Sequence, residues 1–319
     1  MVSKIKRILC PTDWSEPSRV ALHAAVNMAR YEGAELVLLH VLPPLSQVRG
    51  ITLVVPLEQV IQDEAHQKLI ALIAECVPPD VRAQPLIRSG EEAEEIHRAA
   101  LQADVVVMST HGRSDWTHWR FGSVAETVLR ESECPVFVVG PAGAAGADSG
   151  AEQDGRDYCF DFPYKQVLWP TDWSEPSERS LDEAIAIAAH HGAQLLLLHV
   201  IEPPNLAPSD GWHKQHAEFE EHFRKLCSRK PGAQHARRLI CRGVAAEEIT
   251  RVAVAEGADL IVMSTHGRTG WQRLKLGSVA QKVLRQVPCP IFLVPYCATV
   301  SPVAEPQAAA SSALPQKVL

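Results

Sequence analysis

The chain has 319 residues, of which 46% are hydrophobic and 22% are charged, and its formal net charge is −7 at pH 7. This composition is typical of soluble globular proteins, and the length suggests about two domains. The negative charge, with no run rich in lysine and arginine, argues against a nucleic-acid-binding surface. The apolar runs are too short to span a bilayer, and the first residues lack the apolar stretch of a signal peptide. We therefore expect a cytoplasmic protein that contacts neither nucleic acid nor membrane.

Eight cysteines are present, and no two of them form a Cys-x-x-Cys motif. Only Cys134 and Cys289 occur at matching places in the two halves of the chain, each followed by proline. A disulfide framework would be expected to recur in both halves, so we expect reduced thiols, as in the cytosol.

The first half predicts short apolar strands alternating with helices. The expected strands are residues 5–9, 36–41, 82–87, 105–108 and 136–139. A first helix carries Leu22, Ala25, Val26 and Ala29 on one face and stops at Gly33. Further helices are expected at 57–76, 91–102 and 124–131.

The second half predicts the same order of elements. After a first strand that ends before Asp172, strands are expected at 195–201, 236–241, 260–263 and 291–294. A helix with the face Leu181, Ala184, Ile185 and Ala188 stops at Gly192, and others are expected at 218–227, 245–256 and 279–286. Strands that are apolar throughout and alternate with helices indicate an α/β fold with two tandem open parallel five-stranded sheets, each covered by helices on both faces.

Three sequence words recur in the same order in the two halves. Pro-Thr-Asp-Trp-Ser-Glu-Pro-Ser stands at 11–18 and 170–177, Ser-Thr-His-Gly-Arg at 109–113 and 264–268, and Gly-Ser-Val-Ala at 122–125 and 277–280. The period is far longer than a solenoid repeat, so each copy is a domain. We expect domains at 1–140 and 164–297, a linker at 141–163 rich in glycine and alanine, and a disordered tail at 298–319.

The repeated words lie where an open parallel sheet binds ligands, beyond the carboxyl ends of its strands. Asp13 and Asp172 follow the first strand of each half. Gly122-Ser123 and Gly277-Ser278 open a helix, whose free N–H groups and dipole favour an anion. The pattern therefore predicts a phosphate-binding site in each half.

In these repeated words the chain resembles tandem universal stress proteins. The signature of that family is Gly, two residues, Gly, nine residues and Gly-Ser, and here it ends in Gly112…Gly122-Ser123 and Gly267…Gly277-Ser278. The resemblance implies a Rossmann-like strand order of 3-2-1-4-5 in each half. Single-domain relatives pair through their fifth strands, so we expect segments 134–139 and 289–294 to form the seam of an intrachain pseudo-dimer. A further homodimer stays an open alternative.

In ATP-binding members of the family, the aspartate after the first strand and a valine ending the second hold the adenosine, and the glycine loop holds the ribose and phosphates. The resemblance therefore implies ATP or a related adenine nucleotide, with Mg²⁺ as an accompanying candidate. Backbone N–H groups of Gly112, Gly122 and Ser123, and of Gly267, Gly277 and Ser278, are the expected phosphate donors. The implied site residues are Pro11, Thr12, Asp13, Val41, Ser109, Gly112, Arg113, Gly122 and Ser123, and Pro170, Thr171, Asp172, Val200, Ser264, Gly267, Arg268, Gly277 and Ser278.

The chain departs from the family signature in both copies, because Ser109 and Ser264 replace its first glycine. The first copy also has Asp115 where the second has Gly270, with the bulky Trp116 beside it. A carboxylate near phosphates would repel them. We therefore expect the second repeat to be the better nucleotide site.

Structural interpretations of the same residues stay open. Asp13 and Asp172 suit a helix cap, and the Gly-Ser pairs suit a plain helix start. The histidines of the Ser-Thr-His-Gly words suit a hydrogen-bonded scaffold, Trp14 and Trp173 suit core packing, and His40 and His199 suit packing at strand ends. His213, His216 and His222 are too loosely spaced for a metal site, and we expect none.

The leading hypothesis is a regulatory stress-response protein that holds an adenine nucleotide and acts on an unidentified protein partner. The chain has no Walker lysine motif, nucleophile elbow or zinc-protease motif, so we expect no catalytic residues and at most slow ATP hydrolysis. A nucleotide-free interaction scaffold is the first alternative, and a slow ATPase is the second.

Overall fold

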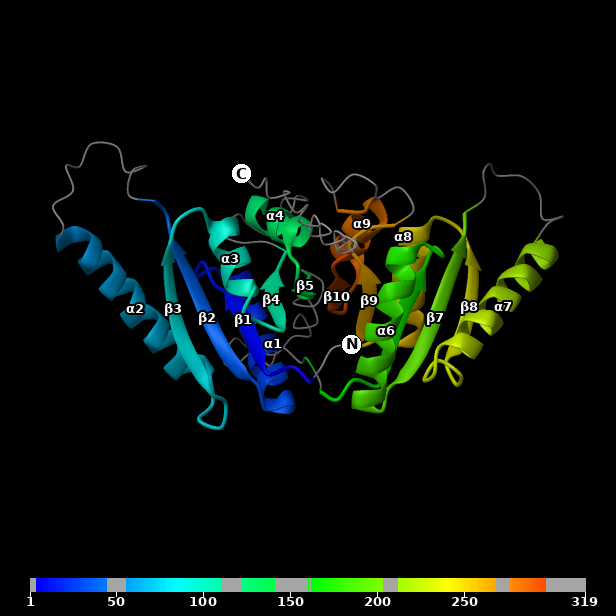
Figure 1. Ribbon diagram of the computed structural model, residues 1–319, viewed down its shortest axis with the longest axis horizontal. Helices are drawn as coiled ribbons and strands as arrows, with labels where there is room; N and C mark the ends of the chain where they lie inside the picture. Colours follow the sequence, from blue (N-terminus) through cyan, green and yellow to red (C-terminus); the bar gives the residue numbers. More distant parts are fainter. Residues whose placement is uncertain are drawn as a thin grey trace, which may run out of the picture.

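The computed structural model describes residues 4–44, 56–110, 122–140, 160, 162–202, 212–267 and 276–296. The two halves lie side by side, and each has its strands between two layers of helices (Figure 1). The first half has strands β1 (Arg7–Pro11), β2 (Glu35–Leu42), β3 (Ala83–Ser89), β4 (Val105–Ser109) and β5 (Val136–Val139), and helices α1 (Glu16–Glu32), α2 (Pro56–Cys76), α3 (Glu92–Ala100) and α4 (Ser123–Glu131).

The second half repeats this order. Its strands are β6 (Gln166–Thr171), β7 (Gln194–Ile201), β8 (Arg237–Arg242), β9 (Leu260–Ser264) and β10 (Ile291–Val294), and its helices are α6 (Glu175–His191), α7 (Trp212–Arg229), α8 (Ala245–Glu256) and α9 (Ser278–Gln286). Every predicted element in the described residues is present. Helix α7 starts six residues before its predicted start at Glu218, because the apolar positions that signal it, from Phe219 on, occupy only its later part.

The strands form one sheet of ten, in the order β3-β2-β1-β4-β5-β10-β9-β6-β7-β8. Within each half all the strand pairs are parallel, and the order 3-2-1-4-5 that the resemblance implies is confirmed. This order places the first and fourth strands side by side, so the loops that follow them leave the sheet at the same edge.

The two five-stranded sheets join at the predicted seam, where β5 pairs with β10 in antiparallel register. Phe137 lies opposite Phe292, with Val138 opposite Ile291 and Val136 opposite Leu293. A fifth strand without a neighbour would expose a row of backbone N–H and C=O groups. The duplication satisfies both edges at once, because each half covers the edge of the other.

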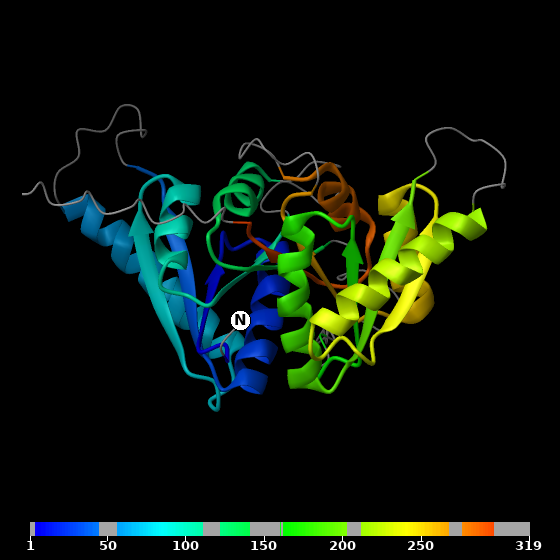
Figure 2. The same cartoon turned by 45° about the vertical axis from the view of Figure 1, so that its right-hand side comes forward.

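Helices cover both faces of the sheet, and alternate strand residues enter two separate cores. Ile8 and Cys10 of β1 face the layer formed by α1, α2, α6 and α7, whereas Leu9 faces the layer formed by α3, α4, α8 and α9. The first core continues across the seam through Phe137 and Phe292. Helices α1 and α6 stand next to each other there, as Figure 2 shows.

Helices α1 and α6 start and end as the sequence predicts. The hydroxyls of Ser15 and Ser174 accept the N–H groups of Ser18 and Ser177 at the two N-termini. Gly33 and Gly192 end the helices in the left-handed conformation, with φ of 67° and 65°. Glycine adopts this conformation without the steric cost that a Cβ adds, which explains the matching stops.

Part of the predicted linker belongs to the seam. Phe160 is buried, and the ring of Phe162 lies 5.7 Å from that of Tyr31 in α1 and 4.8 Å from that of Tyr164. The chain therefore packs against α1 before it enters β6. The rest of the predicted linker, except Pro163, and the predicted tail at 298–319 lie outside the described residues.

The cysteines that the structure describes are free thiols, and three of them, Cys10, Cys227 and Cys289, are buried. Burial raises the pKa of the Cys10 and Cys289 thiols to about 12, so both stay protonated and unreactive at neutral pH. In the described part of the chain, no helix combines the length and apolar character needed to cross a membrane.

The seam predicts a large effect of truncating Phe292. This side chain is 2% exposed and faces its counterpart Phe137. We expect Phe292→Ala to lower the free energy of unfolding by about 3–5 kcal/mol, through lost burial and a cavity that both halves line. Urea unfolding measures this change. Val254→Ala, at a position 61% exposed, is the control and should change stability by less than about 0.5 kcal/mol. Equal effects of the two substitutions would contradict a seam that carries stability.

Candidate functional site

The Pro-Thr-Asp-Trp-Ser word forms the turn between β1 and α1. The Thr12 hydroxyl accepts the N–H of Trp14 at 3.2 Å, and the Asp13 carboxylate accepts the N–H and hydroxyl of Ser15 at 3.1 Å and 2.5 Å. The second copy repeats these bonds from Thr171 and Asp172. The serine, and not the aspartate, caps the helix, and one aspartate oxygen holds the cap. The interpretation of the aspartates as helix caps is therefore wrong: each aspartate binds the serine that caps the helix.

The tryptophans of these turns have left-handed backbone conformations, with φ of 70° at Trp14 and 63° at Trp173. Such a conformation is strained in a bulky residue, so the surrounding bonds must hold it. The Trp14 indole N–H donates to Nε2 of His40 at 3.3 Å, and Nδ1 of His40 lies 2.8 Å from the Thr12 carbonyl oxygen. His40 therefore carries its proton on Nδ1 and ties the turn to β2.

In the second repeat the corresponding pair has different neighbours. Nδ1 of His199 lies 2.8 Å from the Thr171 carbonyl oxygen, and its ring packs 4.2 Å from that of Phe219 in α7. The Trp173 ring lies 4.7 Å from that of Phe223, and its buried indole nitrogen has no hydrogen-bond partner among the described residues. The packing interpretation of the tryptophans and strand-end histidines agrees with these contacts.

The loops after β4 and β9 close onto themselves before the next helix begins. The Gly122 N–H donates to the Thr110 carbonyl at 3.1 Å, and the Gly277 N–H donates to the Thr265 carbonyl at 2.9 Å. These two N–H groups, which are expected to donate to a phosphate, are bonded within the protein in this structure. The first intrahelical bonds come from Glu126 and Gln281, so the N–H groups before them, starting with those of the two serines, have no acceptor within their helices.

The serine in place of the first signature glycine stabilises the second loop. The Ser264 hydroxyl donates to the His266 carbonyl at 2.5 Å, and the Thr265 hydroxyl lies 2.9 Å from Nδ1 of His266. Burial lowers the pKa of His266, so its imidazole is neutral at pH 7. These bonds support a scaffold role for His266. Its counterpart His111 lies outside the described residues.

The second signature glycine meets the aspartate of the first word. A Cβ added to Gly267 would lie 2.8 Å from Oδ2 of Asp172, closer than real Cβ atoms come to such an oxygen. A larger residue at this position would force the carboxylate or the loop to move. The two sequence words, about 95 residues apart, are brought into direct contact at the carboxyl edge of the sheet.

The first repeat has a cavity of about 310 Å³ at this edge. All the implied site residues of this repeat that the structure describes line it: Pro11, Thr12, Asp13, Val41, Ser109, Gly122 and Ser123. The remaining two, Gly112 and Arg113, lie outside the described residues. The fold thus gathers residues from three strand ends and one helix start around one space.

The cavity also has walls that the motifs did not identify. Glu92 and Ile96 come from α3, and Leu39 and Met108 come from the strands. No signature contains Glu92 or Ile96, and the packing of α3 against α4, β2 and β1 brings them to the site. The lining therefore combines apolar side chains with the N-terminus of α4 and the Asp13 turn. The described lining residues include two carboxylates, Asp13 and Glu92, and no lysine or arginine.

The second repeat places its implied residues at the equivalent positions. Pro170, Thr171 and Asp172 end β6 and begin its turn, Val200 lies near the end of β7, Ser264 ends β9, Gly267 lies in the loop, and Gly277 and Ser278 begin α9. Arg268 lies outside the described residues. The same holds for Asp115, Trp116 and Gly270, on which the predicted ranking of the two sites depends.

The α7 histidines do not gather into a metal site. His222 packs against Trp173, and His216 packs against Trp212. Within the described ranges, one group of three potential ligands lies close together, and it consists of other residues, Glu32, His190 and His191.

The contact between the loop and Asp172 predicts opposite outcomes for two alanine substitutions. We expect Gly267→Ala to destabilise the protein by about 1–3 kcal/mol, because its Cβ overlaps the carboxylate. Gly277→Ala is the matched control, since the nearest atom to its added Cβ, the Thr265 carbonyl oxygen, lies at an ordinary 3.4 Å. Urea unfolding compares the two. In a protein that already carries Asp172→Ala, Gly267→Ala should lower the free energy of unfolding clearly less than it does in the unsubstituted protein. An equal loss in the two proteins would contradict the contact.

Comparison with known proteins assigns the family. The model of the universal stress protein family matches residues 4–140 and 163–295. A universal stress protein of Thermus aquaticus is 36% identical over 135 residues, 41% of this chain and 98% of that protein. One of Mycolicibacterium smegmatis is 26% identical over 90% of this chain and 96% of its own length. The crystal structure of a universal stress protein from Archaeoglobus fulgidus has the same fold, with a TM-score of 0.65 and 21% identity over 91% of this chain and 98% of that one. The chain belongs to the universal stress protein family and carries two of its domains in tandem.

Proposed function

We propose that this universal stress protein binds ATP or a related adenine nucleotide at the carboxyl edge of its sheet. The observation that carries the proposal is the cavity of the first repeat, which all the described members of that repeat's implied site line. A volume of about 310 Å³ is at the lower end of the range for small-molecule sites.

The apolar side chains of the cavity lining suit the adenosine part of the nucleotide. Leu39, Val41 and Met108 offer apolar surface for a flat aromatic ring. Asp13 and Glu92 lie at the same cavity, and carboxylates accept hydrogen bonds from hydroxyl groups such as those of a ribose. The two acids therefore favour a nucleoside over a purely apolar ligand.

The N-terminus of α4 suits the phosphates. Backbone N–H groups from Ser123 onward point out of the helix without intrahelical acceptors, and the helix dipole adds positive charge there. Two carboxylates at the cavity oppose an anion. Mg²⁺ bound to the phosphates, or Arg113, would offset that charge.

A site of this kind holds a nucleotide rather than turning it over. The described lining residues include no lysine or arginine to stabilise the charge that develops in phosphoryl transfer. The function that follows is regulatory: nucleotide binding in the cytoplasm tunes a stress response through an unidentified protein partner. Hydrolysis, where it occurs, is slow.

A nucleotide-free interaction scaffold is the second candidate, and a specific observation favours it. The polar groups of the repeated words are largely used within the protein, since Asp13 and Asp172 hold capping serines and Ser264 bonds to its own loop. These bonds explain the words without a ligand. The experiment below separates the two functions.

Substituting the first residue of α4 tests the nucleotide site without disturbing the helix. Proline is well tolerated at this position, and Gly122, with φ −61° and ψ 140°, already has the conformation that a following proline requires. We expect Ser123→Pro to weaken ATP binding at the first site about tenfold or more, because it removes a backbone donor to the phosphates. Isothermal titration calorimetry with Mg-ATP measures the affinity.

The matched control is Ser123→Ala, which removes the hydroxyl and keeps the N–H group. It should weaken binding less than Ser123→Pro does. If the unsubstituted protein neither carries nucleotide on purification nor binds Mg-ATP in calorimetry, the scaffold function takes the place of the proposal.

The ranking of the two repeats is tested by the equivalent substitution in α9. Gly277 has φ −55° and ψ 137°, so Ser278→Pro is equally compatible with its helix start. If the second repeat is the better site, Ser278→Pro removes the tighter of two binding events and Ser123→Pro removes the weaker one. At limiting ATP, native mass spectrometry should therefore find fewer nucleotides bound to the Ser278→Pro protein than to the Ser123→Pro protein. Fewer nucleotides on the Ser123→Pro protein would refute the ranking.

A further inference from the structure

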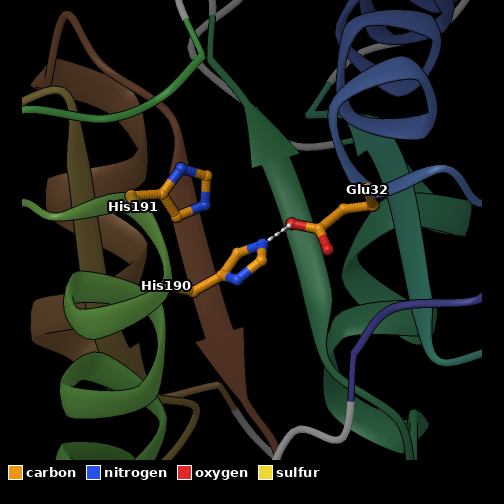
Figure 3. A group of neighbouring side chains, drawn as sticks. All are labelled: Glu32, His190 and His191. Carbon is orange, nitrogen blue, oxygen red and sulfur yellow. Dashed lines mark ion pairs between the residues drawn. The ribbon is translucent and has the colours of Figure 1, made fainter.

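The ends of α1 and α6 meet at the seam and bring three potential metal ligands together. Glu32 is the last residue of α1, and His190 and His191 are the last two of α6. Oε1 of Glu32 lies 3.0 Å from Nε2 of His190, and one ligand atom from each of the three residues lies within 4.8 Å of the others. Figure 3 shows the carboxylate facing the two imidazoles across the gap between the helices.

The duplication explains why these residues meet. Glu32 and His191 occupy the same place in their repeats, each directly before the glycine that ends its helix. The seam pairs β5 with β10 antiparallel, so it relates the halves by an approximate twofold rotation that brings equivalent helix ends together. One repeat contributes a carboxylate at this place and the other contributes imidazoles.

The electrostatics of this place favour a cation. Glu32 is 5% exposed, and a buried carboxylate costs free energy unless a positive charge compensates it. The C-termini of α1 and α6, the negative ends of two helix dipoles, also converge here. Burial raises the pKa of the Glu32 carboxyl, whereas its contact with His190 and the charge of Lys4, which borders the same cavity, act to lower it.

We propose that Glu32, His190 and His191 form a binding site for Zn²⁺ that links the two halves of the chain. Two imidazoles and a carboxylate are a common ligand set for zinc, which then completes its tetrahedron with water. A cavity of about 210 Å³ adjoins all three side chains and has room for that water. The buried hydroxyl of Tyr164, which lines the cavity, has no hydrogen-bond partner among the described residues and is placed to bond to the water.

Zinc binding requires a proton to move at each of the two histidines. At His191, Nδ1 accepts the Tyr164 N–H at 3.3 Å, so the ring proton resides on Nε2, the nitrogen turned toward the other two ligands in Figure 3. A metal on Nε2 moves that proton to Nδ1 and breaks this long bond. The ring is then released to approach Glu32, as it must, because ligand atoms around zinc are about 3.3 Å apart. At His190, Nε2 lies 3.0 Å from Oε1 of Glu32, a hydrogen-bonding distance. Zinc replaces the proton between these two atoms, and that proton passes to Nδ1 of the ring or to water.

The test is a zinc titration of the full chain after treatment with a chelator. We expect calorimetry to show one Zn²⁺ per chain, and Glu32→Gln and His191→Gln each to weaken it by at least about tenfold. His222→Gln, which removes an α7 histidine, is the matched control and should bind zinc like the unsubstituted protein. Zinc should also raise the melting temperature of the unsubstituted protein, because it binds the folded state through ligands from both halves.

Absence of zinc binding, or binding that is equal in all four proteins, overturns the proposal. Circular dichroism shows whether the substituted proteins fold. If they do not, the test is the visible absorption of Co²⁺ bound to the unsubstituted protein. Strong visible absorption, typical of four-coordinate cobalt, supports the site, and the weak bands of octahedral cobalt refute it. Neither readout involves ATP, so this result is independent of the proposed nucleotide site.

Discussion

The antiparallel pairing of β5 with β10 is the constraint on which the rest of this structure depends. Each half alone would end in an apolar fifth strand with unsatisfied backbone groups, which invites uncontrolled association. Joining the halves within one chain removes both edges and buries Phe137 and Phe292 in a core that continues across the seam. The pairing also determines which helices come into contact at the seam, because the twofold relation that it imposes brings the ends of α1 and α6 together.

The second organising element is the turn that follows the first strand of each half. A threonine, an aspartate and a serine share their hydrogen bonds so that the tryptophan between them keeps a left-handed backbone conformation. In the second repeat the carboxylate of this turn lies directly against the glycine loop after the fourth strand. Local bonding and site geometry thus come from the same residues, so structural and ligand-binding interpretations of the repeated words are compatible.

The two halves are copies, and their differences are informative. At the strand ends, His40 accepts the indole N–H of Trp14, whereas His199 packs against Phe219 of a more aromatic α7. At the helix ends, Glu32 of one half faces the histidines of the other. Duplicated surfaces that meet around a twofold axis present the same residue to itself, and two carboxylates there would repel each other. Divergence after duplication allows complementary residues to face each other at the axis, which a homodimer of identical chains cannot achieve.

The sequence by itself determined the duplication, the order of strands and helices, the helix stops at Gly33 and Gly192, and the edge of the sheet at which the repeated words lie. The duplication follows from the repeated words, and the edge follows from the rule for ligand sites in parallel sheets. The elements and helix stops follow from apolar periodicity and capping residues, which act within a few residues. Only the tertiary structure decided that Glu92 and Ile96 line the cavity, that the Gly122 N–H is already bonded, and that Glu32 meets His190 and His191. Each of these depends on the packing of segments far apart in the chain, and such contacts leave no periodic signal because they are set by the sum of many weak interactions across the fold.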